Sequence, residues 1–309
     1  MFITLQRGAD MKVLNFGSLN LDYVYSVDNF LRPGETKSAM DRNTFLGGKG
    51  FNQSIALAKA GIPVYHAGNA GESAGLFRKE LEQYGADVRF LGGDAGICGH
   101  AVIQVDGRGQ NCILIFHGAN YNITEAYVDS VLDQFESGDM VVLQNEINTT
   151  HYIIEEAYKR GMKIALNPSP YDETIQKMPL EKLSWLILNE VEVKDLSGQD
   201  TEEAYVCWFR EHFSNLRVVV TLGRRGALYI DQAQVIRHPA YKTNIVDTTA
   251  AGDVFTGFFL GGQAQGRPVE ETMQIASKAA GISVSRNGAA ASAPTMDEVL
   301  ATELEPLEL

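Results

Sequence analysis

Short apolar runs that end in glycine or polar residues recur along most of the chain. They occupy residues 12–17 (KVLNFG), 64–67, 140–143 (MVVL), 163–166, 185–188 and 217–221. Helical patterns lie between several of them, for example at residues 74–84 and about 150–160. Strands that alternate with helices favour a mainly parallel sheet covered by helices on both faces. The pattern predicts an α/β fold, with no internal repeat and no low-complexity linker that would split the chain.

Two other segments alternate in the manner of short antiparallel strands. The first, residues 23–45, is interrupted by Pro33-Gly34. The second, residues 96–117, contains apolar runs at 101–105 and 112–116 on either side of the turn Asp106-Gly107-Arg108-Gly109. Hairpins of this kind favour a separate small sheet. We expect the two segments to pair with each other and to lie over the main domain.

Residues 17–22 (GSLNLD) follow the first predicted strand and are interpreted as a turn that exposes Asn20 and Asp22. In an open parallel sheet, the loops at the carboxyl ends of the strands hold the ligand. A turn stabilised by Asx hydrogen bonds explains the same residues without a ligand. The pattern alone leaves both interpretations open.

Residues 47–53 (GGKGFNQ) lead into a predicted helix at 54–61 that ends at Gly61. Glycines at a helix start let the backbone approach a ligand closely, and Lys49 and Asn52, three residues apart, would share a face. The spacing is not that of a P-loop. A tight turn before a surface helix remains an equal alternative.

Residues 247–253 (DTTAAGD) precede another apolar, helix-compatible run. The small residues Ala250, Ala251 and Gly252 leave backbone N–H groups open at the helix start, which favours a site for phosphate or another anion. Asp253, in the first turn, could accept a proton from a hydroxyl held beside that anion. Phosphoryl transfer to an alcohol needs this combination. An ordinary capped helix would explain the same residues.

The composition narrows the classes of partner. The chain has 309 residues, 45% of them hydrophobic, and a formal net charge of −13 without a dense run of lysine or arginine. This argues against nucleic acid as the main partner. A helix N-terminus still suffices for a small anionic ligand. No stretch reaches membrane-spanning length without charges or glycines, so no membrane partner is expected.

The cysteines and the N-terminus bear on the compartment. Cys98, Cys112 and Cys207 are odd in number and widely spaced, which favours reduced thiols in a cytoplasmic protein. Residues 1–10 lack the long apolar core and cleavage pattern of a signal peptide. Because Met11 opens the first strand-like run, residues 1–10 are interpreted as an N-terminal extension or as a stretch before an alternative start.

Taken together and in order, these motifs resemble those of the ribokinase-like (PfkB) family of sugar kinases. The matching stretches are 17–22, 47–53, Asn189-Glu190-Val191-Glu192, 221–226 (TLGRRG) and 247–253. The D-T-x-A-A-G-D motif is the most specific, followed by G-G-K-G-x-N. The resemblance implies one kinase domain over residues 11–305, with lid strands inserted at about 19–46 and 96–118.

The resemblance also implies roles for individual residues on the sugar side. Asp253 would be the base, and Ala250, Ala251 and Gly252 would form the anion hole. The positions that hold the sugar in the family correspond to Asn20, Asp22, Gly48, Lys49, Asn52, Glu146 and Asp253. The implied reaction is the ATP-dependent phosphorylation of the 5-hydroxyl of D-ribose to give ribose 5-phosphate.

On the nucleotide side, the matching ATP positions are Asn189, Thr221, Gly223, Gly226, Gly252 and Ser277. Glu192 corresponds to the acidic residue of N-x-x-E and would act on Mg²⁺ through water. A monovalent cation, K⁺ in this family, would be held by Asp247, Thr249, Ser283, Arg286, Gly288 and Ser292, several of them through backbone carbonyls. This ion gives a reason for the turn Ser285-Arg286-Asn287-Gly288 that composition alone does not supply.

Some positions depart from the family pattern. Residues 71–75 (GESAG) stand where the family has G-x-D-x-x-G, with Glu72 beside the missing aspartate, and Ser277 occupies a position that often carries histidine or asparagine near the adenine. Fructose, 2-deoxyribose or a nucleoside therefore remain alternative substrates. A non-catalytic sugar-binding relative is a further alternative, whereas a Rossmann dehydrogenase is disfavoured because no G-x-G-x-x-G follows the first strand. The resemblance implies a homodimer formed through the small sheet.

Overall fold

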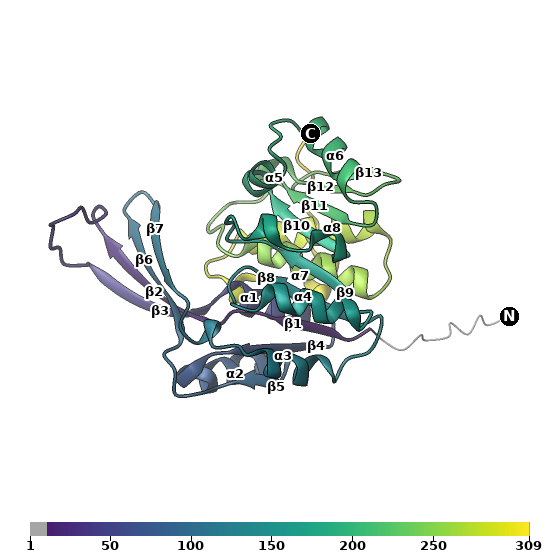
Figure 1. Ribbon diagram of the computed structural model, residues 1–309. Helices are drawn as coiled ribbons and strands as arrows, with labels where there is room; N and C mark the ends of the chain where they lie inside the picture. The colour runs from purple at the N-terminus through teal and green to yellow at the C-terminus, as the bar shows by residue number, and fades with distance from the viewer. Residues whose placement is uncertain (1–10, 309) are drawn as a thin grey trace.

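The computed structural model describes residues 11–308, so the predicted N-terminal extension at 1–10 lies outside the described residues. Within 11–308 the main sheet has nine strands in the order β13-β12-β11-β10-β9-β8-β1-β4-β5 (Figure 1). The strands are β1 (Val13–Phe16), β4 (Val64–Asn69), β5 (Asp87–Gly92), β8 (Met140–Gln144), β9 (Lys163–Asn167), β10 (Trp185–Asn189), β11 (Arg217–Thr221), β12 (Ala227–Ile230) and β13 (Val235–His238). Neighbours from β5 to β11 pair in parallel, and β12 and β13 pair antiparallel. The predicted, mainly parallel sheet is confirmed.

Helices cover both faces of this sheet, because successive strand residues point to opposite sides. Val13, Val142 and Val219 belong to one buried cluster, and Leu14, Val141 and Val218 belong to the other. The first cluster includes residues of α1 (Lys49–Lys59), α2 (Ala74–Gln83), α7 (Ala251–Ala264), α8 (Val269–Ser283) and α9 (Met296–Ala301). The second includes residues of α3 (Glu125–Leu132), α4 (Thr150–Lys159), α5 (Glu190–Ser197) and α6 (Glu202–His212). Burial on both faces explains why the strands read as continuous apolar runs.

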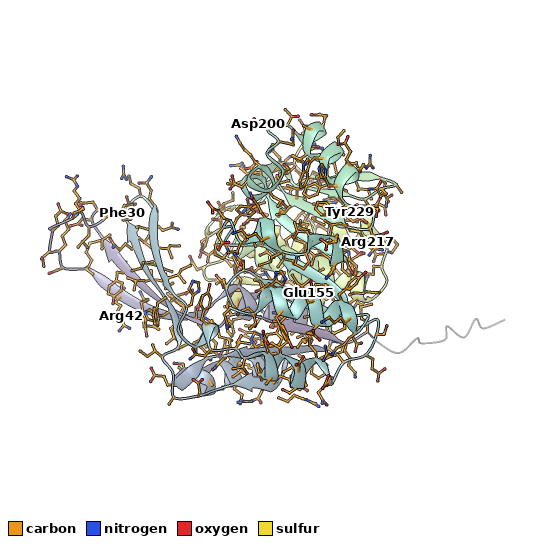
Figure 2. All side chains as sticks on the ribbon, in the orientation of Figure 1. Phe30, Arg42, Glu155, Asp200, Arg217 and Tyr229 are labelled. Carbon is orange, nitrogen blue, oxygen red and sulfur yellow. The ribbon has the colours of Figure 1, made fainter. Side chains whose placement is uncertain are left out.

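The small sheet has four strands in the order β3-β2-β6-β7. They are β2 (Asn20–Val27), β3 (Asp41–Gly47), β6 (Gly99–Asp106) and β7 (Asn111–Phe116), and β2 pairs with β6 in parallel. The predicted pairing of the two segments is confirmed. The sheet, however, projects from one side of the main body instead of lying flat over it, with Phe30 and Arg42 far from Glu155 and Arg217 (Figures 1 and 2).

The interpretation of residues 17–22 as a turn is wrong at its second half. Asn20 and Asp22 lie in β2, where they pair with Gly47 and Phe45 on one side and with Gly99 and Ala101 on the other. Ladder hydrogen bonds to two neighbouring strands thus outweigh the local turn preference of asparagine and aspartate. The two side chains are therefore held by a sheet and not by a loop.

Two observations concern membrane-spanning helices and disulfide bonds. Across residues 11–308, no helix combines the length and apolar character needed to cross a bilayer. The three cysteines, which all lie in this range, are unpaired, with Cys98 buried and Cys112 and Cys207 exposed.

Candidate active site

Helix α7 begins with a strained and open first turn. Its N-cap residue, Ala250, has a φ of 59°, and it is the one non-glycine residue with positive φ in the described part of the chain. No side chain within 11–308 caps the helix start, and the Ala251 N–H donates to the Thr248 carbonyl over a long 3.3 Å. A left-handed alanine costs about 1–3 kcal/mol and persists where the surroundings enforce it. The first-turn N–H groups and the helix dipole are arranged as an anion site requires, and the anion hole stays a prediction.

Asp253 lies in this first turn and is 5% exposed. Helix α1 supplies its partners: Asn52 donates from Nδ2 to Asp253 Oδ2 over 3.1 Å, and Gln53 donates from Nε2 to Oδ1 over 2.9 Å. Lys49 Nζ lies 4.0 Å from Oδ1. Burial opposes the charge of the Lys49 ammonium, but the carboxylates of Asp253, Glu146 and Glu192 together raise its pKa. A buried carboxylate with fixed donors and a nearby cation is suited to accept a proton in a defined direction.

Helix α1 reaches Asp253 because its first turn packs directly on the end of β1. The Phe51 N–H donates to the Ser18 carbonyl over 2.9 Å, and the Gly50 N–H donates to Ser18 Oγ over 3.2 Å. A Cβ atom on Gly50 would lie 2.3 Å from the backbone nitrogen of Ser18. Only glycine permits this approach, which explains the glycine after Lys49 in G-G-K-G.

Glu146, after β8, joins the same cluster. Its Oε2 accepts a short hydrogen bond from the Ser18 hydroxyl and another from the Lys49 backbone N–H over 3.0 Å. Burial, and secondarily the charge of Glu146, raise the pKa of Asp22 to about 7. Near neutral pH the Asp22 carboxyl is therefore divided between its charged and neutral forms.

The remaining sugar-side residues lie around this cluster. Asn52 Oδ1 is buried and has no hydrogen-bond partner among residues 11–308, so it is free to accept from a hydroxyl. Gly48 is the N-cap residue of α1. Asn20 is buried, and its Oδ1 accepts from Asn120 Nδ2 over 2.8 Å, which fixes the orientation of its amide. Asn120 was not predicted from the sequence.

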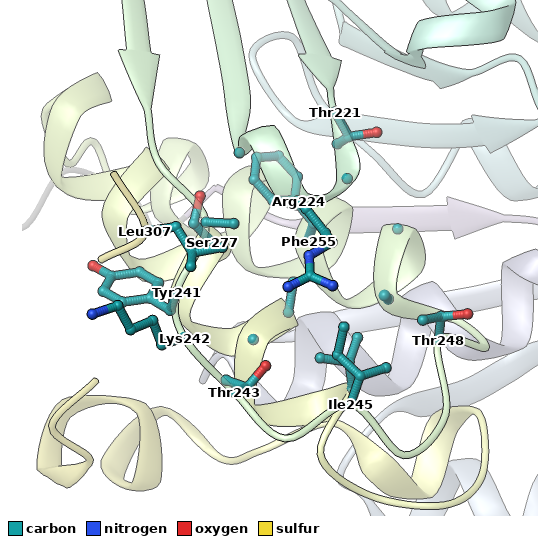
Figure 3. Close-up of a pocket in the computed structure, with 18 residues that line it drawn as sticks. Thr221, Arg224, Tyr241, Lys242, Thr243, Ile245, Thr248, Phe255, Ser277 and Leu307 are labelled. Atoms are coloured by element: carbon teal, nitrogen blue, oxygen red, sulfur yellow. The ribbon is translucent and has the colours of Figure 1, made fainter. Parts of the chain in front are cut away.

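A cavity of about 370 Å³ lies on the other side of the α7 start (Figure 3). Of the predicted nucleotide residues, Thr221, Gly223, Gly226, Gly252 and Ser277 line it. Ser277, Tyr241 and Leu307 lie at one end of the view, and Thr221 and Thr248 lie at the other. The Ser277 Oγ atom is buried and has no partner within the described range. A flat apolar ring with polar edges, such as a nucleobase, fits a lining of this kind.

Asn189 and Glu192 form a capping box at the start of α5. Asn189 Oδ1 accepts from the Glu192 N–H over 2.9 Å, and Glu192 Oε2 accepts from the Asn189 N–H over 2.9 Å. Glu192 Oε1 accepts a short hydrogen bond from the Ser169 hydroxyl. Asn189 is not among the residues that line the cavity, although it pairs with Thr221 in the sheet.

The predicted cation residues come from two loops that Asp247 joins. Its Oδ1 accepts from the Thr249 N–H over 2.9 Å, and its Oδ2 accepts from the Gly288 N–H over 3.1 Å. Burial works against the charged carboxylate, but these hydrogen bonds lower the pKa of Asp247. The Arg286 side chain points instead to Glu298, and the Ser283 and Ser292 hydroxyls donate to the carbonyls of Ala280 and Ala289. Contributions from these three residues to a cation would therefore come from the backbone.

Part of the cavity wall was not predicted. Tyr241 and Thr243 line it from the segment that follows β13, and Leu307 lines it from the C-terminal segment. The two segments pair through the Lys242 N–H to the Glu305 carbonyl and the Leu307 N–H to the Ala240 carbonyl, over 2.8 and 2.7 Å. Neither segment has a periodic pattern or a motif, so the sequence carries no signal for this wall.

Comparison with known proteins gives related enzymes of known activity. Residues 10–296 match the family described as pfkB family carbohydrate kinase. A ribokinase from Staphylococcus aureus is 32% identical over 302 residues, which cover 93% of this chain and 98% of that protein. A deoxyribokinase from Salmonella typhi is 29% identical over 299 residues, which cover 93% and 97%.

A solved structure of Arabidopsis thaliana ribokinase, complexed with ribose and ATP, is similar in fold. It aligns with a TM-score of 0.84 at 28% identity and covers 94% of this chain and 98% of that chain.

Proposed function

We propose that this chain phosphorylates D-ribose at the 5-hydroxyl. The chain belongs to the pfkB family of carbohydrate kinases and is an ATP-dependent sugar phosphotransferase. Similarity to ribokinases over nearly the whole chain supports ribose. The observation that carries the proposal is the position of Asp253, fixed by α1 on one side and next to the open start of α7 on the other.

Asp253 acts as the base in this proposal. Its carboxylate accepts the proton of the 5-hydroxyl as that oxygen forms a bond to the γ-phosphorus, and the bond between the γ-phosphorus and the bridging oxygen breaks to release ADP. The N–H groups of Ala250, Ala251 and Gly252 stabilise the charge that develops on the phosphoryl oxygens. Donors fixed in advance in this way contribute about 3–4 kcal/mol each where they have been measured.

The sugar hydroxyls are bound by the cluster around the start of α1. The carboxylates of Asp22 and Glu146 accept from vicinal hydroxyls, while the free Asn52 Oδ1 accepts from another. Lys49 Nζ, Asn20 and the backbone at Gly48 complete the set. A site that pairs each hydroxyl rejects analogues that lack one, because the partner left behind would be buried and unpaired.

ATP occupies the cavity beside α7, with its base toward Ser277 and its phosphates toward Gly252. Thr221, Gly223 and Gly226 line the path between them. Residues 11–308 contain no group of three or more His, Cys, Asp or Glu side chains that could hold a metal ion alone. Mg²⁺ would therefore rely on nucleotide oxygens and water, with Glu192 acting through water and Asn189 holding Glu192 in place. Bound Mg²⁺ would neutralise charge on the transferring phosphate.

A monovalent cation, K⁺ in this proposal, lies between the two loops that Asp247 joins. Asp247 offers its free carboxylate lone pairs, and Thr249, Ser283, Arg286, Gly288 and Ser292 offer backbone carbonyls. The ion would hold the loop before Ala250 in place and would not touch the sugar.

We also propose a homodimer formed through the small sheet. Strand β7 lies at the edge of the small sheet and is exposed along its whole length, and Ile113, Leu114 and Phe116 are exposed large apolar residues. An exposed apolar edge strand favours contact with a second copy. The predicted cytoplasmic location is part of the same proposal.

A panel of acceptors tests the substrate. ADP release would be measured with D-ribose, 2-deoxy-D-ribose, D-fructose and a nucleoside, each with ATP and Mg²⁺. The highest kcat/KM is expected for D-ribose. A higher value for 2-deoxy-D-ribose, which the similarity to a deoxyribokinase makes the second candidate, would contradict ribose but leave a sugar kinase. Good turnover of fructose with none of either pentose would contradict the pentose assignment altogether.

A further inference from the structure

Beneath Asp253 lies a chain of buried polar side chains that the proposed reaction does not use directly. Asn15, Gln53, Ser54 and His66 are 0% exposed, and Gln144 is 1% exposed. They come from β1, α1, β4 and β8, so they lie at the centre of the main sheet. Burial of this many polar groups costs free energy unless they pair with one another.

Three amides connect the Gly50 carbonyl to Asp253, and their NH₂ groups donate outward from Gln144 in both directions. Asn15 Nδ2 donates to the Gly50 carbonyl over 2.7 Å and to Ser54 Oγ over 2.8 Å. Gln144 Nε2 donates to Asn15 Oδ1 over 2.9 Å and to Gln53 Oε1 over 2.7 Å. Gln53 Nε2 then donates to Asp253 Oδ1 over 2.9 Å. The chain therefore runs from a backbone carbonyl to the carboxylate.

The orientation of each amide follows from groups whose role is fixed. A backbone carbonyl only accepts, so Asn15 must turn its NH₂ toward Gly50 and its oxygen toward Gln144. Gln144 must therefore direct its NH₂ toward the oxygen of Asn15. The same NH₂ donates to the oxygen of Gln53, so the NH₂ of Gln53 faces Asp253.

The other neighbour of Gln53 gives the same result. Asn167 Nδ2 donates to the Ile187 carbonyl over 2.8 Å, so Asn167 Oδ1 is the atom that faces Gln53 Nε2, at 3.3 Å. A flipped Gln53 would place two oxygens against each other at Asn167 and at Asp253 alike. The Gln144 side chain is also closely packed, because its Oε1 atom lies so near the backbone of Gly17 that a Cβ atom there would come within 2.3 Å of it.

The far end of the chain is neutral. Ser54 Oγ accepts from Asn15 and forms a second hydrogen bond of 2.8 Å with His66 Nδ1, whose direction depends on the tautomer of the ring. Burial lowers the pKa of His66 to about 3, so the ring carries no charge at neutral pH. Among the side chains of this hydrogen-bonded network, Asp253 is thus the one charged group.

We infer that Gln53 is a positioning residue for Asp253, and that Gln144 and Asn15 determine which atom of Gln53 faces the carboxylate. The inference rests on the proposed function, in which Asp253 is the base. Gln53 and Asn52 hold one carboxylate oxygen each, which fixes the rotation of the carboxylate plane before the sugar binds. A misplacement of about 1 Å in such a group lowers turnover about 100-fold. No hydrogen bond to the sugar is required of Gln53, Gln144 or Asn15.

Three variants test the inference. Gln53→Met and Gln144→Met keep approximately the same side-chain length and remove the hydrogen bonds. Ser54→Ala is the matched control, because Ser54 is equally buried, follows Gln53 directly and lies on the branch toward His66. Turnover, the KM of the sugar, ADP binding and the thermal midpoint would be measured for each.

We expect Gln53→Met to lower kcat about 100-fold and Gln144→Met about 10-fold, with the KM of the sugar unchanged, because neither side chain binds substrate. Ser54→Ala is expected to lower the thermal midpoint but to keep kcat. A folded Gln53→Met protein with wild-type kcat would overturn the inference. The inference would also be overturned if kcat fell in all three variants in proportion to their loss of stability. That result would mean that the hydrogen-bonded side chains serve packing alone.

Two further outcomes separate this inference from the proposed function. If the wild-type protein phosphorylates none of the panel sugars, or if Asp253→Asn keeps full turnover, the proposed function fails and the inference falls with it. If Asp253→Asn is inactive while Gln53→Met is not impaired, the inference alone fails. Should Gln53→Met not fold, Gln144→Met decides, since it leaves Gln53 in place: full kcat there overturns the inference.

Discussion

On the α1 side of Asp253, polar side chains bind one another through buried hydrogen bonds, whereas on the α7 side a cavity of about 370 Å³ is lined largely by apolar groups and backbone. On the α1 side, hydrogen bonds to neighbouring groups fix the orientations of Asn52 and Glu146. The cavity side has Ser277 as a buried polar atom with no partner within residues 11–308. Removal of a partner on the α1 side leaves buried groups unpaired, which costs about 1–3 kcal/mol each. The sugar side should therefore tolerate change poorly, and the nucleotide side should tolerate it well.

The largest effect is expected from Asp253→Asn. The amide keeps the size of the side chain but does not accept the proton of the hydroxyl, so kcat should fall about 10²- to 10⁴-fold. ADP binding, measured by calorimetry, should stay near that of the wild type, because the cavity lies on the other side of the first turn. Equal losses of turnover and ADP binding would erase the distinction between the two sides.

The next largest effect concerns recognition of the sugar by Asp22. Above about pH 7, where the Asp22 carboxyl is mostly charged, Asp22→Asn replaces a charged acceptor, and a hydrogen bond to a charged group is worth about 1.5–3 kcal/mol, so the KM of the sugar should rise about 10- to 100-fold. The KM of ATP should not change. Initial rates with each substrate varied in turn would show this, and a parallel rise of both KM values would contradict it.

The same substitution is expected to change stability in a pH-dependent manner. The folded protein raises the pKa of Asp22 to about 7 from an ordinary value of 3.8. Over that interval the folded state binds more protons at Asp22 than the unfolded state, so wild-type stability falls as pH rises and levels off above about pH 7. The neutral amide of the Asp22→Asn protein does not titrate and lacks this penalty.

Asp22→Asn should accordingly be the more stable protein at about pH 8, by about 1 kcal/mol, and this gain should nearly vanish toward about pH 4. Thermal denaturation at several pH values measures it. A gain that is constant across pH would show that charge at Asp22 is not its cause.

The smallest effect is expected on the nucleotide side. Ser277→Ala removes one hydroxyl from the cavity wall, and a single neutral hydrogen bond is worth about 0.5–1.5 kcal/mol, so the KM of ATP should rise about 2- to 10-fold. Ser197→Ala is a suitable control, since Ser197 is as buried as Ser277 but lies in α5 and donates to the Val193 carbonyl. If Ser277→Ala raised the KM of ATP as much as Asp22→Asn raises the KM of the sugar, the cavity side would not be the more tolerant of the two.

The sequence predicts the strands and helices of this fold better than the tertiary contacts between them. The strands at 140–143 and 217–221 and the pairing of segments 23–45 and 96–117 are confirmed, because each follows from local alternation or a continuous apolar run. The hairpin β12–β13 was not predicted.

Contacts between distant residues carry no local signal at all. Gln53 and Asp253 are 200 residues apart, and Gln144 is 91 residues from Gln53. Asp253 was predicted because helix-start chemistry is local, whereas Gln53 and Gln144 are indistinguishable in sequence from surface glutamines. The left-handed φ of Ala250 was likewise not predicted, since alanine rarely adopts it.

The hydrogen-bonded chain from Asn15 to Asp253 has a consequence for biosynthesis. A ribosome makes β1, α1 and β8 long before it makes α7, so Gln53 is present with no carboxylate to receive its NH₂. Only when α7 packs against α1 does the last acceptor arrive. Any nascent or truncated chain that ends before residue 253 thus lacks the carboxylate that Gln53 and Asn52 bind in the folded protein. In the proposed mechanism, the base is therefore made after most of the proposed sugar-binding residues.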